Sequence, residues 1–248
     1  MVERQGNWRG WKDFFAARSA RPAPQILADD PQLASIPKSV ARSLAIFQLG
    51  ESGGGTVIEQ ARKSTNSGVD EHYAEAMALF VAEEHRHAEL LACCVRALRG
   101  KLIRKNWTAR LFVFGRRLIG LRLKVMVLLA AEVVGICYYH LLSSRLPDGG
   151  LKKVLTEIVA DEKSHLQFHC CFLRIQVRDQ FDRLVFILTW RLLMFAAAVV
   201  VLIDHRHALR DLGISPGTAW RRWTVYSRTA ENLVSQPRQR PAVHLATR

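Results

Sequence analysis

Apolar residues recur every three or four positions along most of the chain, and no segment shows the alternation that predicts a β-strand. The clearest stripe has spacings of 4, 3, 4, 3 and 4 and consists of Tyr73, Met77, Phe80, Glu84, His87 and Leu91. Two of its members, Glu84 and His87, are polar and fall in the middle of an apolar face. Because buried polar groups need partners, the pattern predicts an amphipathic helix with a polar site on its inner side.

Three other segments show the same arrangement, an apolar helix face interrupted by a carboxylate. The first stripe consists of Val40, Leu44, Phe47, Glu51 and Ile58. The other two consist of Leu121, Val125, Leu128, Glu132, Ile136 and Tyr139, and of Leu155, Ile158, Glu162, His165, His169 and Phe172. The sequence therefore predicts four helices that each turn a glutamate toward a common core.

The connections between these segments predict the topology. A long basic connection at residues 96–118 separates two helical hairpins, and a strongly apolar fifth helix is expected at 180–210. One long crossover between two hairpins is typical of one class of four-helix bundle. We therefore predict an all-α fold, a four-helix bundle with one long crossover and an added apolar C-terminal helix.

The ends of the chain have a different composition from its middle. Several prolines disfavour a helix in residues 1–36, which we expect to form an N-terminal arm. Residues 37–210 are expected to form the bundle, including the fifth helix. Residues 211–248 are expected to be a basic C-terminal tail, disordered from about Ser235 onward.

A glutamate followed one helical hairpin later by Glu-x-x-His occurs twice. Glu51 precedes Glu84 by 33 residues and Glu132 precedes Glu162 by 30, with His87 and His165 completing the two copies. The i, i+3 spacing points both side chains of each Glu-x-x-His at one spot. Carboxylates and imidazoles in this number suit two iron ions, and Mn/Fe or Mn/Mn pairs as well. Glu84 and Glu162 are expected to bridge the metals, and Glu51 and Glu132 to bind terminally. A purely structural polar core is the alternative.

Three glycines, residues 53–55, follow Glu51 after one serine. Glycines inside a helix cost about 1 kcal/mol each relative to alanine. One interpretation is that the helix is thinned so that a substrate or channel reaches the metals. The other is a kink or π-bulge that serves packing alone.

The residues before each motif carry a family resemblance. Glu83 precedes Glu84 and Asp161 precedes Glu162, and this (Asp/Glu)-Glu-x-x-His form resembles the ligand helices of the ferritin-like di-iron carboxylate family, which includes rubrerythrins and bacterial multicomponent monooxygenases. The stretch Phe47 to Glu51 looks most like ferritin-like domain proteins. The resemblance implies a ferritin-like bundle, in which Asp161 accepts a hydrogen bond from metal-bound His87 and Glu83 from His165. The alternative is that both acids face Arg86 or Lys163.

Two other residues on the inner stripes are candidates for the site. His169 lies one turn after His165 and is either an additional ligand or hydrogen-bond partner, or a satisfied core histidine. Tyr139 lies two turns after Glu132 and is either a radical or proton-transfer site, or a packed core tyrosine. Cys137, near Glu132, is expected to be a small core residue rather than a thiolate ligand.

Charge and cysteine content bear on partners and location. The formal net charge of +14 indicates attraction to an acidic protein or an anionic membrane surface, or simply solvated arginines, and no motif for specific nucleic-acid binding is present. The five cysteines include no Cys-x-x-Cys pair, so we expect reduced thiols in the cytoplasm. The apolar run Leu192–Ile203 has 12 residues, short for a membrane-spanning helix. We expect a cytoplasmic protein, or one peripheral to the membrane.

These observations lead to one functional hypothesis and two rivals. We expect an O2- or peroxide-dependent di-iron oxidoreductase that acts on a small apolar substrate. Its electrons come from a separate donor, since the sequence has no flavin or dinucleotide fingerprint. A homo-oligomer is expected. The rivals are iron binding, storage or ferroxidase activity, and a membrane-associated di-iron protein.

Overall fold

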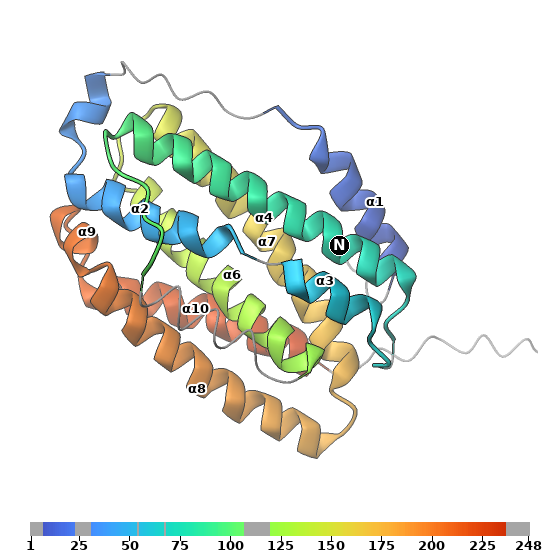
Figure 1. Ribbon diagram of the computed structural model, residues 1–248. Helices are drawn as coiled ribbons and strands as arrows, with labels where there is room; N and C mark the ends of the chain where they lie inside the picture. Colours follow the sequence, from blue (N-terminus) through green and yellow to red (C-terminus); the bar gives the residue numbers. More distant parts are fainter. Residues whose placement is uncertain (1–6, 23–30, 54, 67, 107–119, 237–248) are drawn as a thin grey trace, which may run out of the picture.

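The computed structural model describes residues 7–22, 31–53, 55–66, 68–106 and 120–236, and every regular element in these ranges is helical. The bundle consists of α2 (Lys38–Glu51) followed by the short α3 (Gly55–Arg62), with α4 (Glu71–Ala97), α6 (Leu121–Ser143) and α7 (Gly150–Gln176) (Figure 1). The predicted all-α four-helix bundle is therefore confirmed. Residues 107–119, which include most of the basic crossover, and the tail residues 237–248 lie outside the described part.

The bundle is assembled from two hairpins, with α2 packed on α4 and α6 packed on α7. Asp70 starts α4 by accepting a hydrogen bond from the Tyr73 N–H at 2.9 Å, as an N-cap does. After the other end of α4, a Cβ atom on Gly100 would lie 2.8 Å from the Cβ of Ala41. A glycine is needed there because any side chain would push α2 away from the end of α4.

The first predicted helix is interrupted. The stripe from Val40 to Ile58 predicted one helix, but α2 ends at Glu51 and α3 begins at Gly55. The glycine run explains the break, since glycine loses more backbone entropy in a helix than any other residue. As a result, Glu51 stands at the last residue of a helix rather than in its interior.

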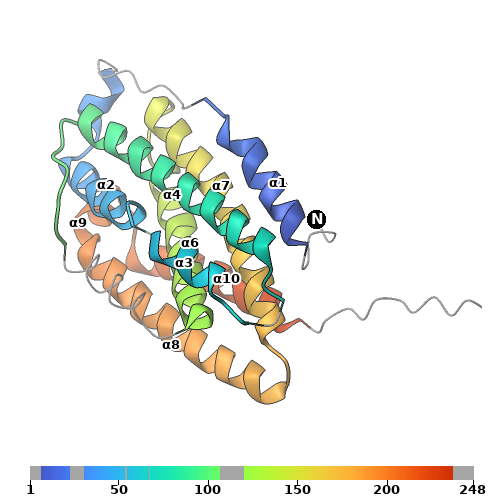
Figure 2. The ribbon, with the colours of Figure 1, turned by 45° about the vertical axis from the view of Figure 1, so that its right-hand side comes forward.

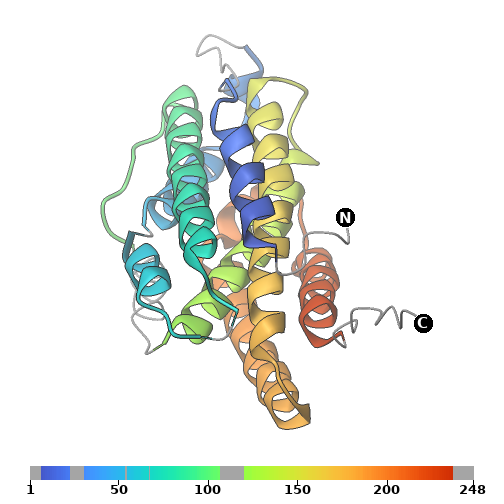
Figure 3. The same ribbon diagram turned by 90° about the vertical axis from the view of Figure 1, so that its right-hand side faces the viewer.

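The residues expected to form an N-terminal arm contain a helix, and this helix covers the bundle. α1 (Trp8–Ser19) lies along α4, and a 3₁₀ turn (Pro31–Ser35) follows later in the arm (Figure 2). Trp8, Trp11 and Phe15 are buried, and their rings contact Phe168 of α7. α1 therefore bridges α4 and α7 on the side that Figure 3 turns toward the viewer.

The C-terminal part adds three helices where one was expected. The predicted apolar helix at 180–210 is divided into α8 (Gln180–Asp204) and α9 (Arg206–Asp211). Beyond it, α10 (Pro216–Ser235) lies in the expected tail and packs against α6, α7 and α8. Ser215 caps α10 by accepting from the Thr218 N–H at 3.2 Å. As a result, α6 lies buried between the other bundle helices and this added layer.

Candidate metal centre

Four of the predicted ligands converge between α4 and α7. One oxygen or nitrogen atom each of Glu84, His87, Glu162 and His165 lies within 4.8 Å of the others. The Nδ1 atom of His165 is 3.0 Å from Glu84 Oε1, and that of His87 is 3.2 Å from Glu162 Oε1. Each imidazole therefore faces the carboxylate of the opposite helix, as the i, i+3 spacing on two facing helices requires.

Glu84 and Glu162 each lie between both imidazoles. Glu84 Oε1 is also 3.6 Å from His87 Nδ1, and Glu162 Oε2 is 3.6 Å from His165 Nδ1. A carboxylate within reach of two imidazoles is placed to bind two metal ions, one beside each ring. The bridging role expected from the sequence stays a prediction, and both carboxylates lie where it requires them.

Glu132 and Glu51 lie at the edges of this group. Glu132 Oε2 is 3.5 Å from His165 Nδ1, and Glu51 Oε1 accepts a hydrogen bond from the Tyr139 hydroxyl at 2.8 Å. Burial raises the pKa of both carboxyls well above its usual range, and the charges of Glu84 and Glu162 raise it further. Each group is thus placed where a carboxylate is unfavourable without a nearby cation.

Several inward-facing atoms of this group lack hydrogen bonds. Among the described residues, the buried atoms without a hydrogen-bond partner include one atom from each of five residues that face one another here: Glu84 Oε1, His87 Nδ1, Glu132 Oε2, Glu162 Oε1 and His165 Nδ1. Orphaned polar atoms are costly in a protein interior, and these converge on one place. Carboxylate oxygen with neutral imidazole nitrogen is the donor set that iron and manganese accept. The residues therefore fit two such ions.

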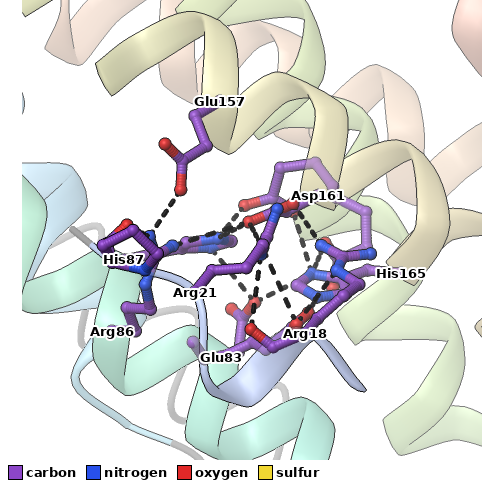
Figure 4. Close-up of polar contacts among 12 residues, drawn as sticks. Arg18, Arg21, Glu83, Arg86, His87, Glu157, Asp161 and His165 are labelled. Carbon is purple, nitrogen blue, oxygen red and sulfur yellow. Dashed lines mark hydrogen bonds and ion pairs between the residues drawn. The ribbon is translucent and has the colours of Figure 1, made fainter. Parts of the chain in front are cut away.

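The outer nitrogens are held by acids from the opposite helix. His87 Nε2 is 3.3 Å from Asp161 Oδ2, and His165 Nε2 is 2.8 Å from Glu83 Oε2 (Figure 4). These are the two pairs that the family resemblance implied. A carboxylate that accepts from Nε2–H leaves Nδ1 free for a metal and makes it a stronger donor.

Arg18 near the end of α1 and Arg21 just after this helix complete the outer layer, and the sequence reading missed both. Arg18 pairs with both acids, its Nε atom 3.1 Å from Glu83 Oε1 and its Nη2 atom on Asp161. Arg21 Nη2 donates to Asp161 Oδ2 at 2.7 Å (Figure 4). Burial alone would raise the pKa of Asp161, but the bonds from His87 and Arg21 lower it to about 2. The acid therefore stays ionised.

A signal for this contact exists in the sequence. Trp8, Trp11, Phe15 and Arg18 follow one another at spacings of 3, 4 and 3, the same pattern as the ligand stripes. The alternative partners proposed for the two acids are partly present, because Arg86 Nη1 lies 3.8 Å from Asp161 Oδ2. Arg86 also donates to Glu157 on α7, which ties α4 to α7 beside the site.

The other candidates divide between the site and the core. His169 Nε2 lies 3.3 Å from Glu132 Oε1, and burial, followed by the nearby His165, lowers its pKa to about 3. It is therefore a neutral ring directly behind Glu132. Tyr139 contacts Glu51, and Cys137 faces α10 instead, 3.7 Å from the carbonyl oxygen of Arg222.

Comparison with known proteins shows the fold. No protein-family model and no curated protein matches the chain. Among solved structures, an R2-like ligand-binding oxidase with an aerobically reconstituted Mn/Fe cofactor is similar, with 14% sequence identity, a TM-score of 0.66 and coverage of 94% of both chains. A point mutant of an R2-like ligand-binding oxidase, also with Mn/Fe, has 14% identity, a TM-score of 0.65 and coverage of 94% of this chain and 95% of its own. The chain therefore has the ferritin-like fold expected from its ligand helices.

Proposed function

We propose that this chain binds two metal ions, Fe/Fe or Mn/Fe, and acts as an O2- or peroxide-dependent oxidoreductase. The observation that carries the proposal is the convergence of the five orphaned carboxylate and imidazole atoms. The fold similarity supports it, since the two similar structures are oxidases that hold Mn/Fe. When bound, the metal pair supplies the redox chemistry, and the protein supplies geometry and surroundings.

We assign the ligands from their positions. Glu84 and Glu162 would bridge, because each lies near both imidazoles. Glu51 with His87 would hold one ion and Glu132 with His165 the other. This chain offers no second electron carrier among its motifs, so a separate protein or reductant would supply electrons.

Two residues around the ligands handle protons and water. Tyr139 holds a proton next to Glu51, because burial and the charges of Glu51 and Glu162 raise its phenol pKa well above the usual range. Phe80 packs edge-on against His165 and His169, with ring centroids 4.8 and 4.7 Å away, and excludes water from that side. The metal pair would thus be shielded from water by Phe80 beside His165, and would have the proton of the Tyr139 hydroxyl beside Glu51.

The substrate would approach from the Glu51 side. Glu51 is partly exposed and stands at the break between α2 and α3, whereas Glu132 is 2% exposed. Phe47 packs on Tyr139 close to Glu51, with ring centroids 5.0 Å apart. An aromatic wall beside the accessible ligand supports a small apolar substrate.

Metal content and oxygen reactivity test the proposal. Protein purified without oxygen should hold two metal ions per chain, measured by elemental analysis, and should give a transient visible band on mixing with O2. Glu84→Ala and His165→Ala should each lose tight metal binding. His85→Ala is the matched control, because His85 is exposed and lies between the two ligands of α4. Two metals in either ligand variant would refute the assignment, and two metals without O2 reactivity would favour a binding or storage role.

A further inference from the structure

Helix α8 is apolar on both of its sides. Phe186, Trp190, Met194 and Ala198 are buried against the rest of the protein. The opposite side is an exposed apolar face made of Phe181, Leu184, Leu188, Leu192, Phe195 and Val199. A helix that is hydrophobic all round normally has no side in water. The α8 face thus has the composition of a covered surface, although no described residue covers it.

The α8 face is unusually long and contains no charge. Its residues follow one another at spacings of 3, 4, 4, 3 and 4, and Leu188 and Leu192 are 61% and 70% exposed. Both α6 and α8 are long and apolar enough to cross a membrane, but α6 is 83% buried in its most apolar window and α8 only 28%. α6 is thus a core helix, whereas α8 is a surface helix with the hydropathy of a core helix.

Exposed arginines lie at both ends of the α8 face, together with acids. Arg178 and Arg183 flank its N-terminal end beside Asp179 and Asp182. Arg206 and Arg210 lie just beyond its C-terminal end, where Arg210 Nε is 3.4 Å from Asp211 Oδ1. The one charge in the middle of the helix, Arg191, turns aside to pair with Glu231 of α10 at 2.7 Å. An apolar strip with exposed arginines at both ends, on a chain whose net charge is +14, favours a surface that is apolar inside and negatively charged at its boundary.

Trp220 of α10 extends the face sideways. It is partly exposed and packs edge-on against Phe195, with ring centroids 5.9 Å apart. Tryptophan is favoured at the boundary between lipid and water because its ring is apolar and its N–H is polar. The edge of the α8 face therefore carries a residue suited to such a boundary.

We propose that the α8 face docks on an anionic lipid surface, with α8 lying in the plane of the membrane rather than crossing it. One side of α8 packs on α6 and α10, and the Trp190 indole donates to the Ser227 carbonyl oxygen at 3.1 Å, so the helix belongs to the folded body. The site at α4 and α7 lies across the bundle from α8 and stays in water (Figure 1). The proposal does not depend on the redox function.

Charge disfavours the two other occupants. If a second copy paired along the α8 face, Arg183 would lie near the partner's arginines at either end, and like charges oppose such an interface. Residues 107–119 are the third candidate, since Asn106 bonds Asp204 at one end of α8 and Arg122 bonds Asp182 at the other. That segment has three arginines and no acid, so its charge does not complement the exposed arginines at the ends of the face.

Vesicle flotation of the full-length protein tests the proposal. The protein should float with vesicles of phosphatidylcholine and phosphatidylglycerol, less with phosphatidylcholine alone, and less at high salt. Leu188→Gln with Leu192→Gln should weaken partition at least about tenfold, because two apolar side chains no longer enter the lipid. Arg206→Gln should weaken it about fivefold. Leu102→Gln and Arg9→Gln, at exposed positions outside α8, are the matched controls and should bind as the wild type does.

Three results would overturn the proposal. The proposal is refuted directly if the wild-type protein does not float with anionic vesicles. Sedimentation showing a dimer that the leucine variant converts to monomer would assign the face to a second copy. If the protein is a monomer that does not bind vesicles, and the α8 amides are protected from hydrogen exchange, the face would be assigned to residues 107–119. The metal content of every variant should equal that of the wild type, so failure here leaves the metal-centre proposal intact.

Discussion

The two sides of the metal centre use the same ligand types but are built differently. On one side Glu51 stands at the end of α2, partly exposed, and is held by the Tyr139 hydroxyl at 2.8 Å. On the other side Glu132 lies inside the uninterrupted α6, 2% exposed, with His169 at 3.3 Å. The Glu51 carboxylate is thus held by a phenol at the end of a helix. The Glu132 carboxylate lies beside an imidazole, within a continuous helix.

The difference indicates that the two carboxylates differ in how freely they can move. A carboxylate inside a packed helix keeps its position, because the backbone on both sides of it is hydrogen-bonded. A carboxylate at a helix end has a freer backbone on one side and can shift when a substrate arrives. This contrast supports the proposal that the Glu132 side fixes the ligand geometry and that the site opens on the Glu51 side.

The largest expected effect comes from removing each terminal carboxylate in turn. Glu132→Ala should weaken metal binding more than about hundredfold, beyond what changes behind the ligands usually cost. Glu51→Ala should have a smaller effect, because the residue stands partly exposed at a helix end, and water can enter and replace the lost ligand once the buried carboxyl is removed. Competition with a chelator measures both affinities. Equal losses would show that the two sides are equivalent.

Sequence reading was most informative where a local pattern decides the structure. Glu84 and His87 share one helix face whatever the rest of the chain does, so their convergence with Glu162 and His165 followed from two stripes and a short-looped topology. The glycines after Glu51 predicted an irregular helix. They did not show that the helix ends at Glu51, because a kink and a break have the same composition.

The outer layer of the site depended on tertiary placement. Arg18 reaches Glu83 and Asp161 only because α1 docks on α4, and neighbouring prolines made residues 1–36 resemble an arm. α10 was missed for a similar reason, because a short apolar stripe with many arginines resembles a basic tail. Both α1 and α10 carry an apolar helical stripe in the sequence, but the residues against which each stripe packs lie far away along the chain.

The next effect concerns Arg18, which contacts the acids on both sides. Arg18→Ala should reduce the free energy of unfolding by about 3 kcal/mol, because it leaves buried carboxylates with fewer cations. Lys12→Ala, which breaks an exposed pair between α1 and Glu75 of α4, should cost about 1 kcal/mol or less. Urea denaturation compares the two variants. Similar midpoints would mean that Arg18 contributes no more than a surface ion pair.

The metal-free protein should lose stability as the pH rises. Burial alone would lower the pKa of His87, but the nearby carboxylates of Asp161 and Glu162 raise it from 6.5 to about 9. A raised folded-state pKa contributes stability that is fully present below 6.5 and is lost as the pH rises through about 9. The loss should be on the order of 3 kcal/mol. Urea midpoints of metal-stripped protein across this range measure it. With metal bound the ring is a neutral ligand, so a loaded sample with the same slope would contradict this explanation.

The smallest expected effect tests the support of Glu51. Tyr139→Phe removes one hydrogen bond to that carboxylate, which is worth about 1 kcal/mol, or about fivefold in metal affinity on this side alone. Tyr138→Phe is the matched control, because the Tyr138 hydroxyl bonds Ser43 and not a ligand. Titration with Mn²⁺ should show one weakened and one unchanged site in Tyr139→Phe, and two unchanged sites in the control. Weakening of both sites in Tyr139→Phe would show that the two sides are coupled, and that the helix break at Glu51 does not separate them.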